Sequence, residues 1–226
     1  MKTRLFTFPV WAALLWLLIA CAPAYVPNTV HTPMLSQKNE FHASVHGGLS
    51  GFDPQLAFAP AENIGVMVNG SFADNTTDTT DNYHKHTFVE AGVGYFTPVG
   101  TKGRFELYGG YGAGVLEAMY ENKLWSDQEK INSNRVFLQP AFGMTSNYFD
   151  ASLASRLAYV KLYSRGESAA GVFVEPVLTT KFGYKFLKGI AQIGLSMPLN
   201  KAQVDFDYQP FMFSLGLQAT IGRQWE

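Results

Sequence analysis

The sequence has little charge and almost no cysteine. Of its 226 residues 15% are charged, and 17 Lys and Arg against 18 Asp and Glu leave a net charge of −1. A soluble domain carries about 25% charged residues, and a nucleic-acid-binding domain has a basic excess that this chain lacks. A single cysteine excludes an internal disulfide framework and every metal site built from several cysteines. No nucleic-acid partner and no cofactor are therefore expected.

Glycine and aromatic residues are abundant instead. The chain has 21 Gly, 18 Phe and 11 Tyr, and 47% of its residues are hydrophobic. A hydrophobic fraction of this size disfavours disorder. Together with the glycine and the aromatic residues it favours an all-β protein.

The N-terminus has the pattern of a secretory signal. Two basic residues precede an apolar run over residues 5–20, which is too short and wrongly flanked for a spanning helix. The run ends in Leu18-Ile19-Ala20-Cys21, and the single cysteine of the chain stands at the last position. This ending resembles the lipobox of bacterial lipoproteins. The resemblance implies removal of a signal peptide over residues 1–20 and a covalent lipid, such as palmitate, on Cys21.

The residues after Cys21 bear on where such a lipoprotein is delivered. By the same resemblance, Ala22 in place of Asp implies delivery to the outer membrane, and no acidic cluster follows it to direct export to the cell surface. The lipid anchor and the N-terminus are therefore expected on the periplasmic side. Residues 21–39 contain three prolines among polar residues and show no hydrophobic period, which predicts a lipidated flexible linker.

From residue 40 onward the hydrophobic period is two. Over residues 105–115 and 211–221 every second residue is apolar or glycine, and the residues between are mostly polar or small. Successive side chains of a strand face opposite sides, so each segment has one apolar face and one mixed face. Ten strands are predicted near residues 40–48, 53–60, 62–73, 84–97, 103–120, 131–145, 147–163, 169–186, 187–198 and 208–222.

The lengths and spacing of these strands are typical of a membrane barrel. Several exceed the five or six residues of soluble sheets and match the 9–11 tilted residues that cross a bilayer. Short turns alternate with longer polar loops, such as 74–83 and 121–130, as in bacterial outer-membrane barrels. Aromatic residues gather near the short turns, as at a membrane–water boundary.

Over residues 40–222 the chain thus resembles the small outer-membrane β-barrel proteins. The resemblance implies an all-β, antiparallel up-and-down transmembrane β-barrel of about ten strands in a domain over residues 40–226, in contact with the lipid bilayer. An even number of strands returns the C-terminus to the side of the N-terminus. Pro140 and Pro176 fall inside predicted strands, where proline cannot donate to the ladder. A soluble sandwich or an open half-barrel is the alternative that they leave open.

The polar faces of the strands are predicted to line the lumen. Acidic and basic side chains are mixed there, and they are expected to pair because unpaired burial is costly. A ten-stranded barrel is only modestly wider than one that side chains fill, so a polar plug is favoured over a narrow pore or a lumenal solute site. The predicted lining residues are His42, Ser44, His46, Asn69, Glu90, Glu106, Tyr108, Arg135, Gln139, Asp150, Arg156, Glu175, Lys181, Gln192 and Gln218.

The histidines suggest a weak metal hypothesis. His84 and His86 share one face of a strand about 7 Å apart, a spacing that allows a shared ion, and Asp78 and Asp81 lie in the adjoining loop. Two ligands do not make a site, and histidines at the edge of a loop are usually solvated. No metal is therefore predicted, and His84 and His86 remain the candidates.

A lipid-acting hydrolase is a further alternative. His42 and Ser44 lie two residues apart on one face, with Glu40 as a possible orienting acid, but no G-x-S-x-G elbow is present. Ordinary polar lining is favoured, and no catalytic residue is predicted. The sequence therefore favours a non-enzymatic outer-membrane lipoprotein with a structural or interaction role through its long outer loops. A narrow, porin-like pore and the hydrolase are the alternatives.

Overall fold

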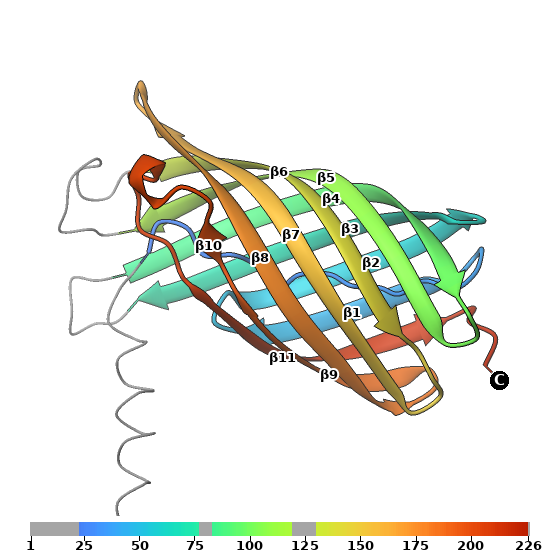
Figure 1. Cartoon of the computed structure of the whole chain (residues 1–226). Coiled ribbons are helices and arrows are strands. Elements are labelled where there is room, and N and C mark those ends of the chain that lie inside the picture. The colour runs from blue at the N-terminus through green and yellow to red at the C-terminus, as the bar shows by residue number, and fades with distance from the viewer. Residues whose placement is uncertain (1–22, 77–82, 119–129, 226) are drawn as a thin grey trace, which may run out of the picture.

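The computed structural model describes residues 23–76, 83–118 and 130–225, and most of these form a β-barrel (Figure 1). The described part contains one short 3-10 helix, η1 (Lys201–Gln203), and no helix in it is long and apolar enough to cross a membrane. The strands are β1 (Phe41–Gly48), β2 (Gly51–Ala61), β3 (Ile64–Thr76), β4 (Tyr83–Val99), β5 (Gly103–Ala118), β6 (Lys130–Met144), β7 (Phe149–Ser164), β8 (Glu167–Tyr184), β9 (Leu187–Leu195), β10 (Met197–Pro198) and β11 (Phe211–Ile221).

The strands close into a cylinder. Each strand from β1 to β8 pairs antiparallel with the next, β8 pairs with β9, β9 with β11, and β11 with β1. The two-residue β10 pairs with β8 and continues β9 after an interruption at Ser196. The result is a closed antiparallel barrel of ten strands, so the prediction of an all-β antiparallel barrel is confirmed.

The two in-strand prolines coincide with gaps in the strand pairing. Pro140 pairs with β5, but the ladder between β6 and β7 skips residues 139–140 in an unchanged register. Pro176 pairs with β7, and the ladder from β8 to β9 begins one residue later, next to the break between β9 and β10. Proline has no N–H, so each of the two residues removes one hydrogen bond from a ladder. The barrel is nevertheless closed, because the neighbouring residues of the same strands remain paired.

The two ends of the barrel differ. Turns at 62–63, 100–102, 145–148 and 185–186 form one end, which we call the short-turn end. The opposite end, which we call the long-loop end, contains the turns at 49–50 and 165–166 and the connection 199–210. Strands β3 and β5 also end there, and the residues that follow them, 77–82 and 119–129, lie outside the described residues. The sequence predicts a longer loop over 164–168 and a shorter one over 48–52, and in the structure both connections are two-residue turns. At 165–166 both residues take a positive φ, which allows a two-residue hairpin turn.

The outer face of the barrel is apolar and uncharged over a continuous zone. On β5 the outward side chains from Phe105 to Val115 carry no charge and are followed by Glu117; on β7 the outward side chains from Phe149 to Tyr159 are followed by Lys161. The other described strands repeat this pattern, and we call the zone the outer belt. Its exposed side chains include Val45, Leu56, Val66, Val68, Val89, Val93, Leu107, Tyr111, Val136, Leu138, Leu153, Leu157, Leu178, Ile193, Phe213, Leu215 and Leu217.

Glycines on the inner face of β5 make room for aromatic rings inside the barrel. A methyl group at Gly110 would overlap the ring of Phe137, and one at Gly112 would overlap the ring of Phe88. The Phe88 ring in turn lies under the guanidinium of Arg135, 4.5 Å from its centroid. The glycines therefore permit the inward packing of rings against the wall.

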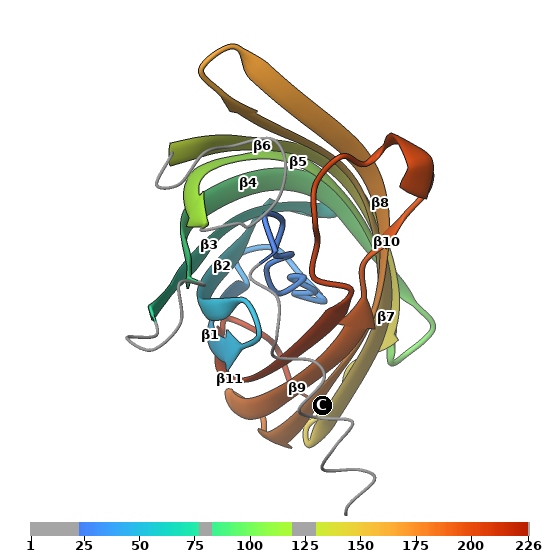
Figure 2. The same cartoon turned by 90° about the vertical axis from the view of Figure 1, so that its left-hand side faces the viewer.

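The chain before β1 runs through the lumen. Residues 23–35 are buried except the half-buried Val26, and Figure 2, which looks into the barrel, shows this stretch inside the ring of strands. The sequence had predicted a flexible linker here, because prolines and polar residues without a period are typical of linkers. From Pro23 onward the structure differs, because the barrel wall supplies the polar partners that the segment cannot provide for itself. Cys21 and the signal peptide lie outside the described residues.

Candidate functional site

Residues 25–36, which we call the lumenal segment, are held by their backbone. The side-chain amide of Gln192 donates to the carbonyl of Val30 and accepts from its N–H, each at 2.9 Å. Asp53 accepts from the N–H of Thr29 at 2.7 Å, and Gln55 donates to the Thr29 carbonyl at 2.9 Å. The backbone bonds of Thr29 and Val30 thus go to side chains of the wall rather than to a neighbouring strand.

The contacts continue along the segment toward the short-turn end. Gln139 donates to the carbonyl of His31 at 2.7 Å, and the Lys181 ammonium donates to that of Thr32 at 2.8 Å. Glu106 accepts from the N–H of Leu35 at 3.0 Å. These partners come from β5, β6 and β8, whereas those of Thr29 and Val30 come from β2 and β9, so strands on different sides of the barrel hold one peptide.

A cluster of four charged residues lies at the middle of the lumen, and we call it the central ion cluster. Arg135 pairs with Glu90, and the Nε of Arg156 lies 2.6 Å from Glu175, with all four side chains at most 2% exposed. The Nη1 of Arg156 is also 3.7 Å from Glu90, which joins the two pairs. Two acids and two bases balance in charge, as buried ions require.

The lumenal segment completes this cluster. The side-chain oxygen of Asn28 accepts from both Arg135 and Arg156, and its amide donates to Glu90 at 3.1 Å. The Tyr25 hydroxyl donates to Glu175 at 2.7 Å. The segment is therefore part of the ionic network of the barrel.

A second charged group lies at the short-turn end. Lys188 is 2.7 Å from Asp150, and Arg223, just beyond β11, is 2.7 Å from Glu40. Burial opposes ionisation of Glu40, but the hydrogen bond from His42 and the charge of Arg223 outweigh it and lower the pKa of Glu40. Arg223 also donates to the carbonyl of Met34, so this group holds the end of the lumenal segment.

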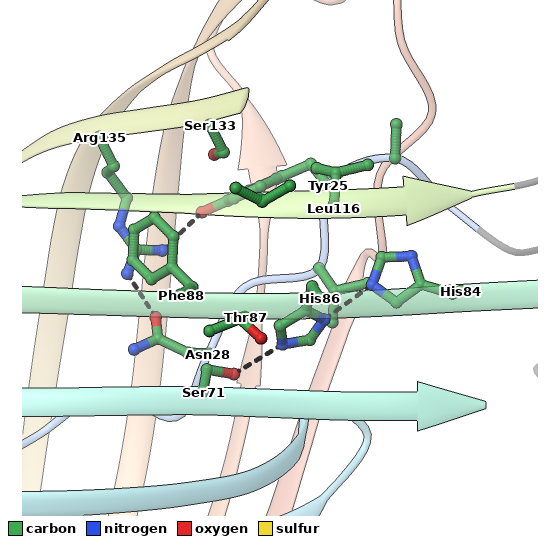
Figure 3. A pocket seen from close by; sticks show the side chains of 13 residues that line it. Tyr25, Asn28, Ser71, His84, His86, Thr87, Phe88, Leu116, Ser133 and Arg135 are labelled. Carbon is green, nitrogen blue, oxygen red and sulfur yellow. Dashed lines mark hydrogen bonds between the residues drawn. The ribbon is translucent and has the colours of Figure 1, made fainter. Parts of the chain in front are cut away.

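A small cavity lies beside the segment near the long-loop end (Figure 3). Its volume is about 30 Å³, and Tyr25, Asn28, Ser71, His86 and Arg135 are among its lining residues. This space suffices for one or two water molecules. The lumen around the lumenal segment is therefore closely filled at this point.

The structure brings His84 and His86 together in a hydrogen bond. Their Nε2 and Nδ1 atoms are hydrogen-bonded at 2.8 Å, and the other ring nitrogen of His86 bonds the Ser71 hydroxyl at 2.9 Å. A metal would have to displace these bonds. Within the described ranges no group of three or more His, Cys, Asp or Glu side chains is placed to hold a metal ion, and Asp78 and Asp81 lie outside them.

Of the three residues in the hydrolase hypothesis, His42 contacts Glu40, whereas the Ser44 hydroxyl bonds another residue. The His42 ring lies 2.6 Å from Glu40, as an orienting acid would require. The Ser44 hydroxyl instead donates to Gln55 at 3.3 Å, and the His42 nitrogen nearest Glu40 also faces Arg223. Glu40, His42 and Ser44 therefore serve in the polar lining in this arrangement.

All of the predicted lining residues are buried. The structure places the side chains of His42, Ser44, His46, Asn69, Glu90, Glu106, Tyr108, Arg135, Gln139, Asp150, Arg156, Glu175, Lys181, Gln192 and Gln218 at 4% exposure or less.

Sequence reasoning missed several polar residues that hold the interior together, and above all it missed the lumenal segment. Lys188, Asp53 and Gln55 alternate with outward apolar residues, so the two-residue period carried their signal. Asn28 and Arg223 lie outside the strands and gave no signal. The missed residues include Asn28, Asp53, Gln55, Lys188 and Arg223.

Comparisons with known proteins give no match. No protein family model, no curated protein and no solved structure matches this chain. The function is therefore argued from the barrel and its contents.

Proposed function

We propose that the chain is a non-enzymatic lipoprotein barrel of the bacterial outer membrane, closed by its own N-terminal segment. Its role is structural or one of interaction through the long loops, and its covalent lipid is carried by Cys21. The observation that carries the proposal is the outer belt, an uncharged apolar surface that surrounds a polar, charge-paired interior.

The dimensions of the outer belt support a membrane span. The eleven residues from Phe105 to Val115, tilted as in outer-membrane barrels, rise about 25 Å, the height of the apolar band of such proteins. Exposed ion pairs, Lys85 with Asp74 at 3.1 Å and Lys130 with Glu117 at 3.7 Å, lie beyond the belt at the long-loop end. Charged residues beyond this boundary and none within the outer belt are expected of a surface that faces lipid, because a charge facing lipid is costly.

Aromatic side chains at the short-turn end add to this argument. Tyr148 and Tyr184 are exposed and their rings lie 5.2 Å apart, while those of Phe149 and Phe182 lie 4.9 Å apart. Tyrosine favours the boundary between lipid and water because one end of its ring is apolar and the other wet. This pair of ring contacts fits one interface of the belt.

The interior supports a plugged barrel over the pore alternative. The lumenal segment occupies the axis of the lumen, and its backbone is bonded to the wall from Asn28 to Ser36. The hydrolase alternative gains no support, because the Ser44 hydroxyl is engaged by Gln55.

The experiment is to reconstitute the full-length lipidated protein in liposomes and in planar bilayers. We expect the protein to resist carbonate extraction, to migrate faster on a gel before heating than after, and to show no single-channel conductance. Regular conductance steps from the wild type would instead establish an open pore. Release by carbonate without detergent would remove the membrane-spanning proposal altogether.

A further inference from the structure

The direction of the lumenal segment separates the two ends of the chain. Tyr25 lies at the long-loop end, where its backbone bonds Asp207 and Gln209 in the loop before β11. Ser36 lies at the short-turn end, where its N–H donates to Glu40 at 2.9 Å. The C-terminus also lies at the short-turn end (Figure 1). The described chain therefore begins at one mouth of the barrel and ends at the other.

Both ends of the segment are fixed. At the long-loop end the Tyr25 ring packs 4.8 Å from that of Phe173, and its hydroxyl bonds Glu175. At the short-turn end Met34 and Asn39 take φ values of 55° and 64°, and they turn the chain from the lumen into β1.

The order of contacts between these ends leaves one direction for the segment. Asn28 meets the central ion cluster, Thr32 meets Lys181, and Leu35 meets Glu106. Along the chain these partners lie progressively closer to the short-turn end. The direction thus follows from a series of independent contacts.

We propose that the N-terminus of the mature chain emerges at the long-loop end, so that the lipid on Cys21 lies in the leaflet that faces the long loops. Cys21 is two residues from Pro23, and two residues reach at most about 7 Å. Outer-membrane barrels have short periplasmic turns and longer extracellular loops. The anchor then belongs to the outer leaflet, opposite to the periplasmic side implied by the signal sequence. This inference rests on the proposed membrane span.

The partner of the anchor is then the lipid of the external leaflet, and the barrel itself carries the N-terminus across the membrane. A chain tethered on the periplasmic side needs its first residues at the short-turn end, beside β1. In the structure that place is taken by the turn at 37–39, where Gln37 bonds the carbonyl of Gly222 at 2.6 Å. The interior polar contacts thus determine the side on which the lipid lies.

The test places one epitope tag at a time in the full-length, lipidated protein in its native outer membrane. The first tag is inserted between Ala22 and Pro23. The second stands in the turn between Arg165 and Gly166 at the long-loop end, and the third stands between Gly100 and Thr101 at the short-turn end. Antibody binding to intact cells and to permeabilised cells is measured for each. Membrane association and heat-modifiable migration confirm that each tagged protein is folded.

The expected result is that the first and second tags bind antibody on intact cells, whereas the third binds only after permeabilisation. If the first tag follows the third tag instead, the N-terminus lies at the short-turn end and the inference is overturned, while the spanning barrel stands. If the second and third tags behave alike, the two ends are not on opposite sides of a membrane. In that case the proposed function fails, and the inference fails with it.

Discussion

At the scale of single residues, the interior depends on matched charges. Each arginine of the central ion cluster contacts an acid and Asn28, and no charged member of the cluster is more than 2% exposed. Removing one member of a buried pair leaves its partner unpaired in a medium of low dielectric constant. The stability lost by such a substitution therefore comes mainly from the buried charge that is left without a partner, and less from the missing hydrogen bond.

Arg156→Met is expected to destabilise the folded barrel by about 3–5 kcal/mol, because Glu90 and Glu175 each lose a cationic neighbour. Urea titration of the protein folded in lipid vesicles measures the free energy of unfolding. Lys161→Met, on the outer face of β7 near the end of that strand, is the matched control and is expected to leave the free energy of unfolding unchanged. Equal free energies of unfolding for the two variants would show that the central ion cluster does not stabilise the barrel.

Glu40 gives a pH-dependent prediction. Its pKa is lowered in the folded state below the ordinary value of 4.5, despite burial, by His42 and Arg223. Its ionised form therefore stabilises the fold above pH 4.5, and this stabilisation is lost as the pH falls through the folded-state pKa.

The test compares wild type with Glu40→Gln across that pH range. The wild type is expected to be the more stable at neutral pH, and its advantage is expected to shrink below pH 4.5. Unfolding titrations at a series of pH values measure the difference. An advantage that stays constant from about pH 6 to about pH 3 would contradict the role of the carboxylate.

At the scale of the elements, each strand presents one face to the lumen and the other to the outside of the barrel. The same alternation that buries Glu106 and Tyr108 on β5 exposes Leu107 and Tyr111. A charge on the outer face of a lipid-facing strand has a cost that depends on depth. Charged substitutions along one strand therefore distinguish lipid from water.

Val93→Arg, in the middle of the outer belt on β4, is expected to cost about 2–4 kcal/mol in a bilayer, and Thr87→Arg, near its boundary with Lys85, about 0–1 kcal/mol. Equilibrium unfolding of both variants in vesicles gives the two values. Similar, small effects at the two positions would indicate a surface in contact with water.

The lumenal segment gives a prediction at the same scale. Gln192→Leu removes both bonds to the backbone of Val30 and leaves a buried N–H and a buried carbonyl without their partner. Hydrogen exchange of the peptide that contains Val30 is expected to accelerate about tenfold or more. Ser155→Ala, on the outer face of β7, serves as control. Unchanged exchange in Gln192→Leu would mean that other contacts hold the segment.

The elements of the barrel could be predicted from sequence because their signal is local. A period of two, as over Phe105–Val115, directly assigns each side chain to one face, and the strand ranges follow from it. The lumenal segment has no such signal. Its backbone is satisfied by Gln192, Asp53 and other side chains far away in the chain, and only the closed barrel brings these together. Composition alone made it resemble a linker.

At the scale of the whole molecule, the barrel has a polar, charge-paired interior and an apolar exterior. Folding buries the charged residues of the central ion cluster and leaves Val93 and Ile193 about 60% exposed. An exposed apolar surface of this extent marks contact with a membrane or with another protein, and we propose that the membrane covers it. The membrane-spanning proposal depends on that contrast.

The most direct measurement is the solvent exposure of the outer belt. A nitroxide spin label at Val93→Cys, in a Cys21→Ser background refolded into vesicles, is compared with one at Lys161→Cys. The account predicts frequent collisions with oxygen and rare collisions with a water-soluble nickel complex at position 93, and the reverse at position 161. Equal access of the nickel complex to both positions would contradict it.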